Sequence, residues 1–417
     1  MSGLFRELWF LWKDRAAKVW LAIAFLAASI SVFLGLAEVS SQRDTIDRLL
    51  EADQIEREAV AAAHSDWGSA AYYTFHLTYD PPSNFAFASL GQRDISPWKH
   101  RIRMLALEGQ IHESDAANPE FALIGRFDFA FVAAMIAPLF LILLLHDLRA
   151  SERVGGRYEL LSSTSSEASG PWMSRASWRV SMLAIATLIP LWTGAVIGDS
   201  ASSAVLIASF ALILHLCFWW ALAAWINAQA WTSTVNLTAL IGAWLALAVV
   251  APLAIKSGID AAIPVPDGGD IMLTQREAVN DAWDLPKDAT MGPFLERHPE
   301  LVEYGEIAAT FEWKWYYAFQ QVGDQIAEPL SYAYRDGKAR RDNLASVLSW
   351  LSPPSKVERV LQSVAGTDAR AAAAYEARVR AYHAALRDYY YSNLFPEHPF
   401  TSEAIAKRPD FQATSES

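Results

Sequence analysis

The sequence has little cysteine and little charge for its length. Its 417 residues include one cysteine, Cys217, so no disulfide bond can form within the chain. Charged residues make up 19%, hydrophobic residues reach 53%, and there are 17 tryptophans. This balance is more typical of a membrane protein with sizeable water-exposed parts than of a purely soluble or purely embedded chain.

The sequence also lacks the short motifs of common catalytic and metal sites. It contains no G-x-x-x-x-G-K-[ST] run, so any ATP hydrolysis must come from a different polypeptide. Its nine histidines form neither a close His-x-His pair nor an H-E-x-x-H motif, so we predict no metal site. No nucleophile elbow, carboxylate pair or cofactor loop is recognisable. We therefore expect this chain to be no enzyme and to hold no cofactor.

Long uncharged runs are the main feature that is present. A helix needs about 20 mostly apolar residues to cross the hydrocarbon core, and none of the runs contains Asp, Glu, Lys or Arg, which are costly at that depth. The alternative, buried helices of a soluble core, usually gives runs of about 10–14 residues. A cleaved signal peptide is disfavoured for the first run, which is long and lacks a clear cleavage site. The five predicted spans are 19–37, 129–145, 180–198, 204–226 and 235–255.

Basic residues in the short loops predict the topology. Residues 1–18 carry four basic residues against two acidic ones, and the loop 146–179 carries five arginines against four acids. The positive-inside rule places both segments in the cytoplasm. Residues 38–127 and 257–417 then lie outside and hold nearly all of the net charge of −12. An acidic exterior disfavours a nucleic-acid partner.

The predicted fold class is an all-α membrane protein with five transmembrane helices and two mainly helical extracytoplasmic domains, 38–127 and 257–417. Residues 1–18 form an amphipathic segment, interpreted as an interfacial helix rather than as an extension of the first span. A charged helix over 40–66 is expected to continue the first span outward. Further helical patterns cover 273–283, 299–335, 355–364 and 368–394.

The loop 146–179 is the most informative short region. A charged helix end runs into Gly155 and Gly156, and a short amphipathic piece with Tyr158, Leu160 and Leu161 follows. This pattern predicts a small helix with an apolar edge that a cytoplasmic partner could bind. An ordinary connecting loop is an equal alternative.

Three further residues are candidates because of their position. His215 lies within the fourth span, where an ionisable residue is by default a candidate functional site, although it could simply hydrogen-bond a neighbouring helix. Arg126 and Asp128 lie at the outer mouth of the second span, and the family resemblance given below implies either a structural ion pair or a gating role for them, with the structural role favoured. Two residues apart on a helix they would not face each other, so each is expected to pair with another segment.

Several segments together resemble a known family. They are LFRELWFLWKDR (4–15), FAFASLGQRDISPW (85–98), NPEFALIGRFDFAFV (118–132), ERVGGRYELLSS (152–163), SPPSKVERVLQSVAGTD (352–368) and YHAALRDYYYSNLF (382–395). In these segments the chain resembles the permease subunits of ABC-2-type exporters that carry large extracytoplasmic domains. It differs from many relatives in showing no sixth span and in reading SSTSSEASG after Leu161, where relatives tend to be basic with a proline.

The resemblance implies a function and a set of partners. The chain would be the membrane subunit of a bacterial inner-membrane exporter. Its partners would be a separate ABC ATPase that binds ATP and Mg²⁺, a second permease, identical or homologous, and periplasmic proteins. The segment that would bind the ATPase comprises Glu152, Arg153, Gly156, Arg157, Leu160 and Leu161. An alternative is a membrane-anchored envelope scaffold that transports nothing and binds periplasmic partners. An integral-membrane enzyme is a third hypothesis, which the missing catalytic motifs disfavour.

Overall fold

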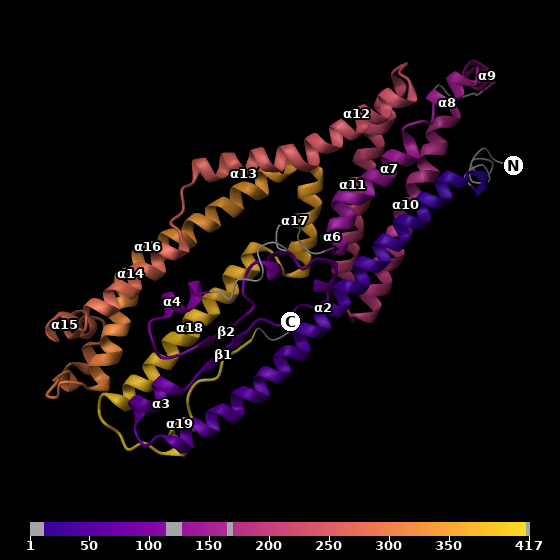
Figure 1. Ribbon diagram of the computed structural model, residues 1–417. Coiled ribbons are helices and arrows are strands. Elements are labelled where there is room, and N and C mark those ends of the chain that lie inside the picture. The colour runs from indigo at the N-terminus through magenta and orange to yellow at the C-terminus, as the bar shows by residue number, and fades with distance from the viewer. Residues whose placement is uncertain (1–11, 114–126, 165–169, 414–417) are drawn as a thin grey trace.

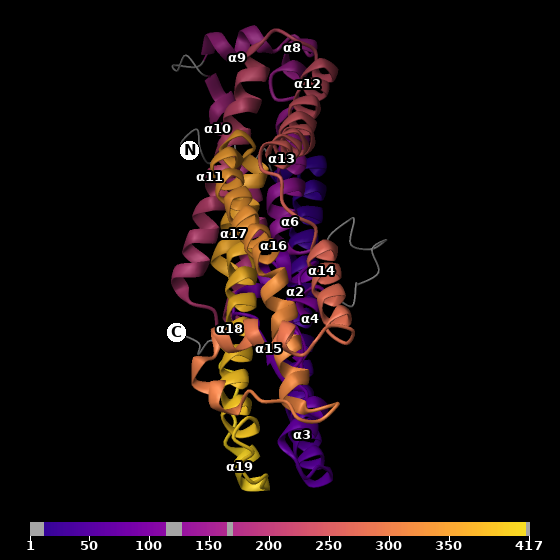
Figure 2. The ribbon, with the colours of Figure 1, turned by 90° about the vertical axis from the view of Figure 1, so that its left-hand side faces the viewer.

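The computed structural model describes residues 12–113, 127–164 and 170–413. The protein is elongated, with a bundle of apolar helices at one end and a helical body at the other (Figures 1 and 2). We call the two ends of the bundle the hairpin end, where residues 146–164 and 170–179 lie, and the domain end, where the body lies.

Among the residues that the structure describes, five helices are long and apolar enough to cross a membrane, which confirms an all-α membrane protein and the five predicted runs. The second contains a wide π-helical turn, η3 (Val132–Ile136), between α6 (Phe129–Phe131) and α7 (Ala137–Leu145). The fifth joins α12 (Ser233–Leu245), the π-helical turn η4 (Ala246–Val250) and α13 (Ala251–Ala262). The other three are α2 (Arg15–Ala63), α10 (Gly170–Ile197) and α11 (Ser202–Ala228).

Helix α2 extends far beyond the bundle. Asp14 caps its start by accepting a hydrogen bond from the Ala17 amide at 3.1 Å, and the helix then runs for 49 residues, or about 74 Å at 1.5 Å per residue. This confirms the helix predicted over 40–66. Of the predicted interfacial segment, residues 1–11 lie outside the described residues, residues 12 and 13 are helical, and α2 begins after Asp14, at Arg15.

The body is built from two parts of the chain. The first supplies α3 (Trp67–Tyr73), β1 (His76–Tyr79), η1 (Ala86–Ala88), η2 (Gly91–Asp94), β2 (Lys99–Ile102) and α4 (Leu107–His112). The strands pair antiparallel, with His76 opposite Ile102, and were not expected from the sequence. The second part supplies α14 (Gly268–Asp281), α15 (Asp288–Arg297), η5 (Pro299–Tyr304), α16 (Trp313–Leu348), η6 (Ser349–Leu351), α17 (Pro353–Ala365), α18 (Ala369–Leu394) and α19 (Ser402–Ala406).

The two predicted outer domains pack around one shared core. Trp67 and Ile102 from the first region lie in the same buried cluster as Phe294, Tyr317 and Leu386 from the second. Polar contacts also join them, because the carboxylate of Asp324 accepts the amides of residues 107 and 108 at 2.8 and 3.0 Å. The two regions are therefore parts of one body.

Helix α17 packs within the bundle. Val357, Leu361 and Ala365 belong to the same buried core as the apolar helices, and α17 packs against α11 and η3. The sequence placed residues 355–364 in the outer domain, because a 13-residue amphipathic helix is too short to be recognised as a span.

Candidate functional site

The loop predicted to bind a partner folds into a helical hairpin at the hairpin end. Helix α8 (Ala150–Val154) and helix α9 (Tyr158–Thr164) are joined by Gly155, Gly156 and Arg157. Gly156 has φ +66°, a left-handed conformation that other residues adopt only with strain. The glycine at this position therefore allows the sharp turn between the two helices.

Glu152 is the centre of the hairpin's charge network. Its carboxylate accepts a hydrogen bond from Arg157 at 2.7 Å, across the turn, and one from Arg175 on α10 at 3.2 Å. Burial would raise the pKa of Glu152, but the bonds from the two arginines outweigh it and lower the pKa. One carboxylate thus connects both hairpin helices to the third span.

Arg153 and Tyr158 attach the hairpin to other helices of the bundle. The Arg153 guanidinium donates to the Gln229 carbonyl at the end of α11 at 2.9 Å and lies over the Tyr158 ring, 4.8 Å from its centre. Tyr158 in turn stacks on Trp172 of α10, with 5.6 Å between ring centres. The hairpin is therefore held by both the third and the fourth span.

Despite these attachments, the hairpin presents apolar side chains outward. Val154 is 86% exposed and Leu160 is 65% exposed. Leu161 is half-buried, and its amide continues the helix by bonding to the Arg157 carbonyl at 3.0 Å. Of the predicted apolar edge, Leu160 is exposed, whereas Tyr158 packs on Trp172 and Leu161 is half-buried. Val154 on α8 adds an exposed apolar side chain that the sequence did not indicate.

Polar contacts that the sequence analysis missed fix the hairpin end of the bundle. Arg179 of α10 pairs with Asp14 at the start of α2, at 2.8 Å. Asn227 donates to the Leu145 carbonyl at 3.1 Å, and Asn236 donates to the His146 carbonyl at 3.2 Å and to Asn227. Lone asparagines near the ends of apolar runs were the available indication of such cross-helix bonds.

Asp128 is a structural residue at the domain end. It caps α6 by accepting the Phe131 amide at 2.9 Å, and its second oxygen accepts the Leu90 amide at 3.0 Å. Burial raises the pKa of this carboxyl group to about 6, although these amide bonds oppose the rise. Asp128 therefore joins the segment 85–98 to the second span, whereas Arg126 lies outside the described residues.

The segment 85–94 packs against the bundle at its domain end. Phe87 is fully buried against α2 and α10, at two glycines. A Cβ atom on Gly35 would lie 2.0 Å from the Phe87 carbonyl oxygen, and one on Gly194 would lie 2.6 Å from the Phe87 ring. The backbone of this segment thus approaches the first span as closely as only glycine permits.

His215 bridges two helices. Its Nε2 lies 3.2 Å from the carbonyl oxygen of Ala134 in the wide turn η3, and its ring meets Trp219 edge-on. This geometry matches the neighbouring-helix hydrogen bond weighed as the alternative to a functional role. Within the described ranges, no cluster of three or more His, Cys, Asp or Glu residues could hold a metal ion.

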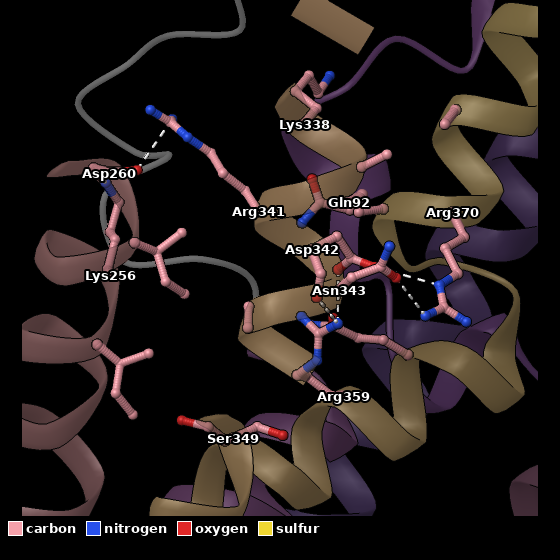
Figure 3. A pocket seen from close by; sticks show the side chains of 18 of the residues that line it. Gln92, Lys256, Asp260, Lys338, Arg341, Asp342, Asn343, Ser349, Arg359 and Arg370 are labelled. Atoms are coloured by element: carbon pink, nitrogen blue, oxygen red, sulfur yellow. Dashed lines mark hydrogen bonds and ion pairs between the residues drawn. The ribbon is translucent and has the colours of Figure 1, made fainter. Parts of the chain in front are cut away.

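A chamber of about 960 Å³ lies at the domain end, between α13 on one side and α16, α17 and the start of α18 on the other (Figure 3). Asp260 of α13 reaches Arg341 of α16 at 3.0 Å across one edge of this space. On the facing side Asp342 pairs with Arg359 at 2.6 Å and with Arg370 at 3.4 Å. The sequence analysis did not identify this site, because its walls come from residues about 100 positions apart in the chain.

One comparison with known proteins gives a match. Residues 271–414 match the model of a family described as a domain of unknown function, DUF3526. The match begins in α14 and therefore covers the second part of the body together with α17. No curated protein and no solved structure matches the chain.

Proposed function

We propose that this chain is the membrane-spanning subunit of a bacterial ABC exporter, working with a separate ATPase and a second permease copy or homologue in the inner membrane. The N-terminus and the hairpin would lie in the cytoplasm and the body outside. ATP, Mg²⁺ and the hydrolytic step would belong to the partner.

The observation that carries the proposal is the α8–α9 hairpin. An exposed apolar edge costs free energy in water unless a partner covers it, and Val154 and Leu160 are largely exposed. Glu152 and Arg153 attach the hairpin to the third and the fourth span. A loop that only connects two helices does not need such attachments. An exposed but firmly attached helix pair suits a docking element that transmits movement.

The same contacts suggest where the movement would go. A displacement of the hairpin would act on α10 through Glu152 and on α11 through Arg153. At the domain end, α10 packs against Phe87 and α11 packs against α17. Rigid helices with two alternative packings could then carry the change into the body.

The decisive experiment is co-purification of the full chain with an ATPase encoded beside it. We expect Val154→Ser and Leu160→Ser together to abolish co-purification, because they remove the apolar edge and leave the hairpin's charge contacts in place. The matched control is Val196→Ser, which changes an 80% exposed valine at the domain end of α10. Retention of the ATPase by the double variant would refute the docking role, and stable isolation without any ATPase would favour the scaffold alternative.

Orientation is tested separately by cysteine labelling in intact cells. In a Cys217→Ser background, we expect a cysteine placed at Glu403 to react with a membrane-impermeant maleimide, and one placed at Leu160 to react only after the cells are opened. The reverse pattern would contradict the proposed topology.

A further inference from the structure

The segment between α16 and α17 reaches into the membrane region of the bundle. The Ser352 hydroxyl at the start of α17 donates to the Leu247 carbonyl in the wide turn η4, at 2.7 Å. At 1.5 Å per residue, Leu247 lies about 20 Å along the span from Ser233, and the hydrocarbon core is about 30 Å thick. The start of α17 therefore lies at hydrocarbon depth, and the helix leads back toward the body.

The exposed side of this segment is apolar. Val347, Trp350 and Leu351 are 67%, 68% and 63% exposed at the turn from α16 into α17. The ammonium group of Lys356 lies over the Trp350 ring, 4.5 Å from its centre. Apolar side chains at this depth contact lipid, and the long Lys356 side chain can extend along the tryptophan toward the membrane interface.

The chamber beside this segment has two chemically different walls. Along α13, which continues the fifth span, the lining combines apolar Pro252, Ile255 and Ile259 with one charged edge, where Lys256 and Asp260 lie beside Arg341. Along α16, α17 and α18 the wall is charged, as the close-up shows (Figure 3). A ligand that satisfies both walls must itself be amphipathic.

The chamber as a whole is lined by fewer acidic than basic groups. Arg359 and Arg370 share the carboxylate of Asp342, and Lys256 and Arg341 share the carboxylate of Asp260. The chamber is lined by four acidic residues and by six basic ones, namely Lys256, Arg335, Lys338, Arg341, Arg359 and Arg370. This excess is notable in a chain of net charge −12, and it makes the chamber a favourable place for an anion.

Two of the basic residues remain available for a ligand. Arg335 forms no ion pair with any residue that the structure describes and donates only to the Ser331 carbonyl of its own helix, at 3.3 Å. Lys338 lies over the Tyr334 ring, 4.9 Å from its centre, and reaches Glu376 only at 3.8 Å. Both lie on α16 three residues apart, so they face the chamber from the same side of the helix.

We propose that the chamber binds the anionic head of a membrane amphiphile, bearing a phosphate or a carboxylate, whose acyl chains leave along α13 into the bilayer. The apolar α13 wall, the lipid-facing turn at Trp350 and the basic wall then each contact a different part of one molecule. That this amphiphile is the exporter's substrate rests on the proposed function, whereas its binding does not require the ATPase.

The test measures binding of short-chain lipids to the purified full chain in detergent. The probes are dioctanoyl phosphatidylglycerol, the zwitterionic dioctanoyl phosphatidylcholine, and glycerol phosphate as the head group alone. We expect tight binding only of phosphatidylglycerol, weakened about tenfold by Arg335→Gln with Lys338→Gln, since two charged contacts of modest strength are lost. The control pair is Arg276→Gln with Arg340→Gln, which makes the same charge change on exposed residues outside the chamber.

Either of two results would overturn the inference. One is equal binding of both lipids regardless of the variant. The other is binding of glycerol phosphate as tight as that of the lipid, which would make the chamber a site for a soluble anion. ATPase co-purification is measured on the same preparations, so that a failure of lipid binding with the ATPase still attached refutes the amphiphile and leaves the proposed function standing.

Discussion

A substitution at Glu108 tests whether the body is one cooperative unit, because this side chain in the first part of the body pairs with Arg380 in the second. The Arg380 guanidinium donates to both of its carboxylate oxygens, at 3.2 and 2.9 Å, and the two side chains are only 15% and 10% exposed. Burial would raise the pKa of Glu108, but hydrogen bonds from His112 and Arg380 outweigh it and lower the pKa from 4.5 to about 2. A shift of this size corresponds to about 3 kcal/mol of folding free energy.

The lowered pKa of Glu108 determines how its contribution to stability changes with pH. Since the pKa is lower in the folded state, the contribution is fully present above pH 4.5 and is lost as the pH falls through 2. At pH 3 about 1.5 kcal/mol of it should remain. We therefore expect Glu108→Gln to lower the unfolding free energy of the body by about 3 kcal/mol at pH 7, which is the range for breaking one side of a buried pair, and by about half as much at pH 3.

The assay is urea unfolding of the full chain in detergent, followed by near-ultraviolet circular dichroism of the aromatic-rich body. The matched control is Glu403→Gln, which removes the exposed Glu403–Lys407 pair, 86% and 70% exposed, and should change the free energy by less than about 1 kcal/mol. Equal stability of the two variants at pH 7, or a Glu108→Gln deficit that persists unchanged at pH 3, would refute the reasoning.

Three further predictions concern the bundle. Gly35→Ala should destabilise the protein by about 2 kcal/mol in thermal unfolding, because the new methyl group would lie against the Phe87 carbonyl. The control Gly242→Ala has open space around it and should be neutral or slightly stabilising. Equal losses of stability in the two variants would contradict the close approach of Phe87 to Gly35. Glu152→Gln should speed hydrogen exchange in residues 158–164 without removing the apolar edge, and unchanged exchange would mean that the ion pairs do not hold the hairpin. Between pH 4 and 6 the raised pKa of Asp128 favours its protonated form in the folded state, so the contribution of this group to stability falls as the pH rises. Asp128→Asn should therefore make the slope of the melting temperature against pH more positive in this range, and an unchanged slope would contradict this.

The hairpin shows which parts of a candidate site can be predicted from a continuous stretch of sequence. The charged helix end, the two glycines and the short amphipathic piece predicted a small helix, and α9 lies there, after a turn in which Gly156 is left-handed. The sequence could not show that Glu152 pairs with Arg175, or that Arg153 reaches Gln229, because these contacts join residues 23 and 76 positions apart. Side-chain pairing at such separations depends on how the spans pack.

What the sequence by itself determined are the five apolar helices and the long outward extension of the first, because hydrocarbon length, absence of charge and helical periodicity are properties of continuous stretches. Only the tertiary structure decided that α17 packs among those helices, that both outer regions share one core, and that Lys256 and Arg359 line the same chamber. The physical reason is that these features depend on which faces of distant segments bury each other, and a short amphipathic helix has the same local pattern wherever it packs.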